Sequence, residues 1–168
     1  MNWYVLYCQS LKAERLCQTF NKKQDIYAFI PQYEYYRRDI KGYVIKPMFP
    51  GYIFVQTKRN QIEFDSVILH MYEEKDGLIK QLRYDGTTAL SHEEIHMFHQ
   101  LLDDEGLLRM SQAFIKEKKA VVYKGPLMNF EENIIKVDKH NQFAYLDLKF
   151  LNRNIKAGLC VDMQNNEV

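Results

Sequence analysis

The order of apolar and polar residues divides the chain into a longer part with strand and helix patterns and a shorter part with strand patterns alone. In the longer part, apolar or alternating runs predict strands, and apolar residues three to four apart predict helices. We expect strands over residues 3–9, 26–30, 34–38, 43–45, 51–57 and 77–84, and helices from Ser10 to Lys23, around 62–72 and from Ser91 to about residue 102.

The helical spacing stops after about residue 112, and short strands then follow at close intervals. They are expected over residues 120–123, 133–137, 143–148, 154–156 and 159–162. Turn residues separate them, including Gly125-Pro126 and Gly158. Five such strands indicate a small closed barrel, because closure removes exposed strand edges.

Two helix starts carry capping signals. Ser10 is expected to cap the first helix, which has Leu11 among its core positions. Ser91 caps the third helix, and Glu94 three residues later completes a capping box. The core stripe of this third helix is expected to be Ile95, Phe98, Leu101 and Leu102.

These patterns predict an α+β protein of two domains. The first is an α/β sandwich with an antiparallel sheet and flanking helices over residues 1–105, and the second is a five-stranded β-barrel over residues 114–168. A short linker over residues 106–113 joins them. A chain of 168 residues is long enough for two small domains.

Composition and charge narrow the class of protein. The net charge is +1, so no overall field draws the protein to nucleic acid, and any such contact must be local. Cys8, Cys17 and Cys160 have no metal or redox spacing, which indicates reduced thiols in a cytoplasmic protein. We expect no signal peptide, because no basic and then apolar leader follows Met1. The apolar runs are also too short to span a bilayer, so no membrane is expected as a partner.

Three segments carry a resemblance that covers almost the whole chain. They are Trp3-Tyr4-Val5, the F-P-G-Y turn at Phe49-Pro50-Gly51-Tyr52, and Gly125-Pro126-Leu127 after the strand at Val121–Tyr123. In order and spacing, these segments resemble the NusG family of transcription elongation factors. The resemblance implies an N-terminal NGN domain that binds RNA polymerase and a C-terminal KOW barrel, with no cofactor and no active site.

The aromatic residues around the F-P-G-Y turn have two possible roles. On neighbouring strands of one sheet, alternate side chains face the same side, so Trp3 and Phe54 can simply be core residues. The resemblance implies instead an apolar patch that grips the clamp coiled coil of RNA polymerase, for which aromatic anchors are suited. The expected polymerase-binding residues are Tyr4, Phe49, Pro50, Gly51, Tyr52 and Phe54.

A hairpin around residue 40 combines cations with tyrosines. Arg37, Arg38, Lys41 and Lys46 alternate with Tyr35, Tyr36 and Tyr43. Cations bind phosphates and aromatic rings stack on bases, so this hairpin is a candidate nucleic-acid site, although it can also be an ordinary solvated hairpin. The resemblance places this face near the non-template DNA strand of the transcription bubble.

The expected barrel is a second candidate nucleic-acid site. Its cations lie near Tyr123, Phe143 and Tyr145 and are candidates for binding a nascent RNA hairpin: Lys118, Lys119, Lys139, Lys149 and Arg153. Residues 107–115 and 136–140 resemble the specialised LoaP-type antitermination paralogues. Two features depart from the family pattern, the absence of glycines over 129–133 and Phe150-Leu151-Asn152-Arg153 in place of an F-G-R turn. A protein partner, such as a ribosomal protein or Rho, is the alternative.

One motif suggests an enzyme. His92-Glu93-Glu94-Ile95-His96 matches H-E-x-x-H, the pattern of two zinc ligands and a general base on one helix. Leu102 occupies the position of the third ligand, and the motif falls in the capping turn of a short helix. We therefore expect no metal and no catalysis, with a zinc hydrolase as a distant alternative.

The sequence thus predicts a monomeric factor that binds RNA polymerase through its N-terminal domain and suppresses pausing or termination. Its barrel would recruit nascent RNA or a protein. The main alternative is a KOW-type RNA-binding protein that acts in translation or ribosome assembly.

Overall fold

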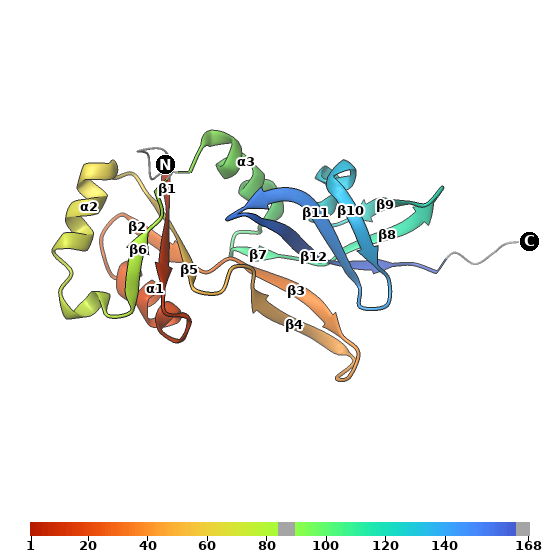
Figure 1. The fold of residues 1–168 in the computed structure, drawn as a ribbon, viewed down its shortest axis with the longest axis horizontal. Helices are drawn as coiled ribbons and strands as arrows, with labels where there is room; N and C mark the ends of the chain where they lie inside the picture. The colour runs from red at the N-terminus through yellow and green to blue at the C-terminus, as the bar shows by residue number, and fades with distance from the viewer. Residues whose placement is uncertain (84–89, 164–168) are drawn as a thin grey trace, which may run out of the picture. The chain divides into compact units, whose positions relative to one another are not determined.

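The computed structural model describes residues 1–83 and 90–163 (Figure 1). The chain forms two compact units, each built from two separate stretches of sequence. The first contains residues 1–31 and 49–98, and the second contains residues 32–48 and 99–168. The hairpin around residue 40 therefore groups with the C-terminal part of the chain, whereas the sequence assigned it to the N-terminal domain.

The first unit contains a four-stranded antiparallel sheet in the order β2-β5-β1-β6. Its strands are β1 (Asn2–Cys8), β2 (Ile26–Phe29), β5 (Tyr52–Thr57) and β6 (Leu78–Gln81). Its helices are η1 (Ser10–Lys12), α1 (Ala13–Asn21), α2 (Gln61–Leu69), η2 (Glu73–Lys75) and α3 (His92–Leu101), whose last residues belong to the second unit.

Helices α1 and α2 contribute to a core on one face of this sheet (Figure 1). Leu16 and Phe20 of α1 and Phe64 of α2 pack with Leu6 and Ile53 of the two central strands. Asn60 and Glu63 form a capping box that satisfies the first amides of α2.

The start of the first helix differs from the prediction. Ser10 begins the short turn η1, and α1 starts after Lys12 without a side-chain cap. Leu11 is fully exposed rather than part of the core. The three-residue period of η1 differs from that of an α-helix, so a helical periodicity counted from Leu11 does not give the correct face.

Aromatic side chains fill the other face of the sheet. The ring of Trp3 lies 5.8 Å from that of Phe29, and Phe54 lies 4.9 Å from Phe98 of α3. Phe98 and Leu101 are buried, as the predicted stripe of this helix requires. The predicted capping box is confirmed, since the Glu94 amide donates to Oγ of Ser91 and the Ser91 amide donates to the Glu94 carboxylate.

The second unit contains a three-stranded sheet and a five-stranded sheet. The first has the order β4-β3-β7, and the second has the order β10-β11-β12-β8-β9. The strands are β3 (Gln32–Arg37), β4 (Gly42–Pro47), β7 (Leu107–Leu108), β8 (Ser111–Lys116), β9 (Lys119–Lys124), β10 (Ile134–Asp138), β11 (Phe143–Phe150) and β12 (Arg153–Val161). Two short turns, η3 (Pro126–Asn129) and η4 (Glu131–Asn133), connect β9 to β10.

The five-stranded sheet is a half-barrel, and with the first unit it confirms the α+β class. In the described part, β9 and β10 are its edges and form no ladder with each other. The amide of Val122 in β9 instead donates to the carboxylate of Glu131 in η4. A side chain thus satisfies an edge amide that a closed barrel would pair with a strand.

Two strands of the half-barrel were predicted incorrectly. Strand β8 was not expected, and β12 is one continuous strand where the sequence predicted two that were separated at Gly158. Residues 106–113, the expected linker, contain β7 and the start of β8. The side chain of Asp103 accepts hydrogen bonds from the amides of Glu105 and Leu107 and so organises the turn before β7.

Gly158 allows β3 and β12 to approach each other closely. A Cβ atom at this position would overlap the carbonyl oxygen of Glu34 in β3 and Sδ of Met110. The carbonyl is part of the backbone and cannot rotate away. The glycine in β12 is therefore a packing requirement and not a strand break.

We predict that Gly158→Ala destabilises the second unit by about 1–3 kcal/mol, the usual cost of overpacking. Thermal and urea unfolding followed by circular dichroism measure the effect. Gly42→Ala is the matched control, because the nearest atom to its Cβ would be 3.8 Å away. Equal unfolding curves for the two variants would contradict the close approach.

The cysteines lie in environments that disfavour the thiolate. Burial raises the pKa of Cys17 to about 12, with smaller effects from Cys8 and Glu14. Burial also raises the pKa of Cys8, and burial together with Asp162 raises that of Cys160. Cys8 and Cys17 are buried, whereas Cys160 is partly exposed.

At pH 8 we therefore expect iodoacetamide to modify Cys160 before the other two cysteines in the native protein. In denaturant all three should react at similar rates, because unfolding removes the burial that suppresses the thiolate. Peptide mapping by mass spectrometry measures each rate. Native Cys17 reacting as fast as Cys160 would disprove the packing around α1.

No helix in the described part of the chain is long and apolar enough to cross a membrane.

Candidate functional site

The register between β1 and β5 separates Tyr4 from the other predicted polymerase-binding residues. Tyr4 pairs with Val55, so its side chain lies on the helix-covered face and not on the face of Phe54. Its ring stacks on Phe64 at 4.3 Å, and its hydroxyl donates to the carbonyl of Arg59 at 2.8 Å. Burial raises the pKa of Tyr4, together with nearby carboxylates. The expectation that Tyr4 shares a face with Phe54 is wrong.

Phe49 and Phe54 lie on the opposite face but are covered. Their exposed fractions are 2% and 0%, and each packs within 6.5 Å of the Phe98 ring, measured between ring centroids. Truncating a buried phenylalanine typically costs 3–5 kcal/mol of stability. A Phe49→Ala variant would therefore lose folding stability, and any loss of partner binding could not be separated from that effect.

Gly51 is buried within the F-P-G-Y turn. Its φ of +86° favours glycine, and a Cβ atom there would lie 3.0 Å from the carbonyl oxygen of Cys8. The Cys8 amide donates to the Gly51 carbonyl at 2.7 Å. Gly51 thus fixes the turn against the end of β1, while the preceding Pro50 is exposed.

Tyr52 and Tyr7 form the accessible part of this face. They are cross-strand partners, their ring centroids are 5.0 Å apart, and both are half-buried. We call Tyr7, Tyr52 and the adjacent Pro50 the tyrosine patch. The sequence analysis missed Tyr7, although alternation along β1 places it on the same side as Trp3 and opposite to Tyr4.

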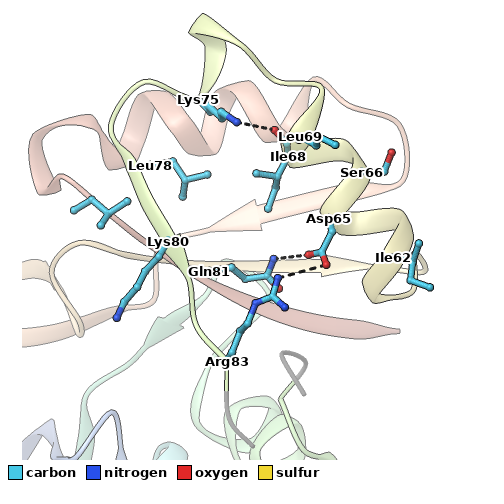
Figure 2. Close-up of a pocket in the computed structure, with 11 residues that line it drawn as sticks. Ile62, Asp65, Ser66, Ile68, Leu69, Lys75, Leu78, Lys80, Gln81 and Arg83 are labelled. Atoms are coloured by element: carbon cyan, nitrogen blue, oxygen red, sulfur yellow. Dashed lines mark hydrogen bonds and ion pairs between the residues drawn. The ribbon is translucent and has the colours of Figure 1, made fainter. Parts of the chain in front are cut away.

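A separate hollow of about 790 Å³ lies between α2 and β6 (Figure 2). Ile62, Ile68 and Leu69 of α2 contribute apolar side chains to it. Asp65 also lines it, but its carboxylate is occupied by Gln61, Gln81 and Arg83. The hollow therefore offers an apolar surface. The Asp65 carboxylate is held by its hydrogen-bond and ion-pair partners and is not a candidate for acid–base chemistry.

The hairpin cations differ in how they are engaged. Arg37 is paired with Asp39, and the Lys46 ammonium lies 5.1 Å from the centroid of the Tyr35 ring. Lys41 is exposed at the turn, with a positive φ of 50°. Arg38 reaches His140 in the turn between β10 and β11, where its Nη1 lies 2.5 Å from Nδ1 and 2.8 Å from Nε2.

The barrel cations gather in a groove between the two edges of the half-barrel. This edge groove has a volume of about 950 Å³. Its lysines come from both sides of the gap between β9 and β10: Lys116, Lys118, Lys119, Lys136 and Lys139. Glu117, Glu131 and Glu132 also line it, and the carboxylate of Glu131 is engaged by the Val122 amide.

Three of the five predicted barrel cations therefore come together. Lys118, Lys119 and Lys139 line the edge groove, whereas Arg153 is exposed at the start of β12 and does not line it. The side chain of Lys149 lies outside the described part of the structure. Lys116 and Lys136 were not selected from the sequence. Lys116 lies two residues from Lys118 and pairs with Lys119 across the β8–β9 turn, whereas Lys136 of β10 comes near these lysines only through the fold.

The aromatic residues of the half-barrel lie beside further cations. The Lys156 ammonium is 3.7 Å from the centroid of the Phe143 ring, and Lys136 is 5.6 Å from that of Tyr145. Phe143 is buried, Tyr145 is half-buried, and Tyr123 is exposed with its hydroxyl donating to Asp162. Tyr123 and Tyr145 therefore remain accessible for stacking.

The H-E-x-x-H segment forms the first turns of α3. His92 and His96 are exposed on this helix. Within residues 1–83 and 90–163, no three histidine, cysteine or acidic side chains are grouped as metal ligands would be. Glu94, at a variable position of the motif, caps the helix.

The comparisons agree with the N-terminal motifs. Residues 1–99 match the sequence model of the family described as transcription termination factor nusG. The chain belongs to the NusG family. NusG-family proteins are transcription factors that bind RNA polymerase. The comparison with curated proteins found no match.

A solved structure of NusG from Thermotoga maritima, described as a study of domain interaction, has the same fold. The TM-score is 0.56 at 15% sequence identity, and the match covers 95% of this chain and 93% of that one. The likeness therefore extends beyond the residues matched by the family model to the C-terminal half-barrel.

Proposed function

We propose that this protein is a transcription elongation and antitermination factor that docks on RNA polymerase through the tyrosine patch. The observation that carries the proposal is the half-buried, partly accessible Tyr7–Tyr52 pair beside the F-P-G-Y turn of a NusG-family domain. Tyrosines supply a large contact area at low entropic cost, which suits an anchor for an apolar helical tip. Buried Phe49 and Phe54 support this surface from behind.

The proposed mechanism requires binding energy alone. A factor that bridges the polymerase clamp favours the active state if it binds that state more tightly than the paused one. A difference of about 1.4 kcal/mol changes the ratio of paused to active enzyme tenfold. A modest interface around Tyr7 and Tyr52 is sufficient for that effect.

We further propose that the edge groove binds nascent RNA. Five lysines line this groove in a protein whose net charge is only +1. Local cations of this kind attract the phosphate backbone, and Tyr123 and Tyr145 can stack on unpaired bases. The combination of lysines and accessible tyrosines favours RNA over a ribosomal protein or Rho as the partner. RNA binding is also what the resemblance to the LoaP-type branch implies. Contact of the hairpin with non-template DNA, and a cytoplasmic location, are part of the same proposal.

The docking prediction uses the double variant Tyr7→Ala, Tyr52→Ala. It should retain core RNA polymerase at least about tenfold less well in a pull-down, because truncating paired anchors typically costs 2 kcal/mol or more. Tyr72→Ala is the matched control, since Tyr72 is 77% exposed in the same unit and lies outside the patch.

Circular dichroism must confirm that the double variant is folded. A folded double variant that binds polymerase as well as the Tyr72→Ala control would refute docking through the tyrosine patch. It would leave RNA binding by the edge groove untouched.

The RNA prediction uses Lys118→Gln, Lys119→Gln in the full chain. Affinity for an RNA hairpin with an unpaired loop should fall, and the slope of log affinity against log salt should become shallower by about 1–2. Fluorescence anisotropy at several salt concentrations measures both quantities.

The adjacent pair Lys22→Gln, Lys23→Gln is the matched control, because it removes the same charge from the end of α1. Both double variants should retain polymerase equally well. If the wild-type chain shows no salt-dependent binding at micromolar concentration, RNA binding is wrong and a protein partner becomes the better proposal.

A further inference from the structure

A small cationic hollow joins the tip of the β3–β4 hairpin to the turn between β10 and β11. Its volume is about 450 Å³. Its residues are far apart in the sequence but belong to the same compact unit: Tyr36, Arg38, Lys139, His140 and Gln142. Arg38 and His140 meet directly across it, 102 positions apart in the chain.

The carboxylates nearest to this hollow are already engaged. Asp39 is paired with Arg37, and hydrogen bonds from the backbone and side chain of Asn141 lower the pKa of Asp138. In the described part, no carboxylate lies within 4.0 Å of Arg38 as a salt-bridge partner. The hollow therefore presents cationic and neutral hydrogen-bonding groups without a local counter-charge on Arg38.

Packing of β3 holds the hairpin against the half-barrel, and the contact with His140 positions Arg38 at its tip. The carboxylate of Glu34 in β3 accepts from the Met110 amide at 3.2 Å and pairs with Arg109. The ring of Tyr35 stacks on Phe143 of β11 at 5.4 Å, and β3 lies against β12 at Gly158. A cation held in advance loses little conformational freedom when a ligand binds.

We propose that Arg38, Lys139 and His140 form a subsite for a backbone phosphate of a nucleic-acid strand. Lys139 lines both this hollow and the edge groove, so the two sites share one cation. The proposal rests on the proposed binding of nucleic acid by that groove and extends the path of the strand onto the hairpin. The guanidinium of Arg38 offers a planar fork of donors, which suits phosphate oxygens.

The neighbouring residues fit a phosphate with an attached nucleoside. The tyrosine hydroxyl of Tyr36 and the amide of Gln142 are neutral groups that can bind a sugar or an additional phosphate oxygen. Lys46 and Lys156 lie over the aromatic rings of Tyr35 and Phe143 nearby, which adds positive charge on the same unit. RNA and single-stranded DNA share this backbone chemistry.

His140 contributes to the subsite through its contact with Arg38, since both of its ring nitrogens lie within hydrogen-bond distance of the guanidinium. Lys139 precedes it in the same turn and also lines the hollow. A phosphate bound at the hollow would therefore meet a guanidinium, an ammonium and an imidazole together.

The test measures binding of the full chain to a labelled RNA hairpin with an unpaired loop and to single-stranded DNA of the same length. Arg38→Gln should weaken binding about tenfold and reduce the salt slope by about one. Lys124→Gln is the matched control, because this exposed lysine of the same unit lines neither the hollow nor the groove. Thermal unfolding confirms that both variants are folded.

A second arm uses His140→Gln, which should also weaken binding, because it removes the ring that Arg38 contacts across the hollow. Preference for RNA or for DNA identifies the source of the phosphate. Inorganic phosphate at millimolar concentration should compete weakly with either strand.

The outcomes separate the subsite from the proposed function. If Lys118→Gln, Lys119→Gln weakens binding but Arg38→Gln and His140→Gln do not, the subsite is wrong and the edge groove remains. If the wild-type chain binds neither strand, both proposals fail. Equal effects of Arg38→Gln and Lys124→Gln would also overturn the subsite, since they would indicate general charge alone.

Discussion

The register of β1 against β5 determines how the first unit presents its aromatic residues. Tyr7 pairs with Tyr52 and Tyr4 pairs with Val55, so alternate residues of β1 go to opposite faces. A shift by one residue would bring Tyr4 out of the core and bury Tyr7. Gly51 secures this register at the turn, because the Cys8 amide donates to its carbonyl. The tyrosine patch thus depends on a backbone arrangement as much as on its own side chains.

The second unit depends on a similar close contact. Strand β3 approaches β12 only because Gly158 has no side chain, and this contact holds the hairpin against the half-barrel. Arg38 and His140 meet as a consequence. Cations that lie a hundred positions apart therefore form one surface, and its charge is local in a chain that is nearly neutral overall.

Much of the fold follows from local patterns in the sequence. Alternation and apolar runs predict β1, β5 and the β3–β4 hairpin, and the capping box at Ser91 predicts the start of α3. The failures have a common physical cause, which is that tertiary contacts override local signals. Glycine is typical of turns, but Gly158 lies inside a strand and allows a close backbone approach. Leucine is typical of cores, but Leu11 lies exposed on a short turn.

The site was less predictable than the fold. The family resemblance selects Phe49 and Phe54 as anchors, yet large aromatic side chains are also what a core requires, and both are buried. Similarly, Lys136 and His140 have no local signal, because their role depends on which strand end lies beside them. Pairing between distant strands supplies that information, and a single sequence does not contain it explicitly.

In the proposed function, the covalent link between the two units would make RNA binding more effective. Docking of Tyr7 and Tyr52 on polymerase would confine the edge groove near the transcribed RNA, so that its binding would become effectively intramolecular. Weak phosphate contacts would then be sufficient, because a high local concentration replaces intrinsic affinity. Weak contacts would also release the RNA as the polymerase moves, whereas a tight site would oppose elongation. The edge groove is lined by glutamates as well as lysines, and this mixture moderates its positive charge.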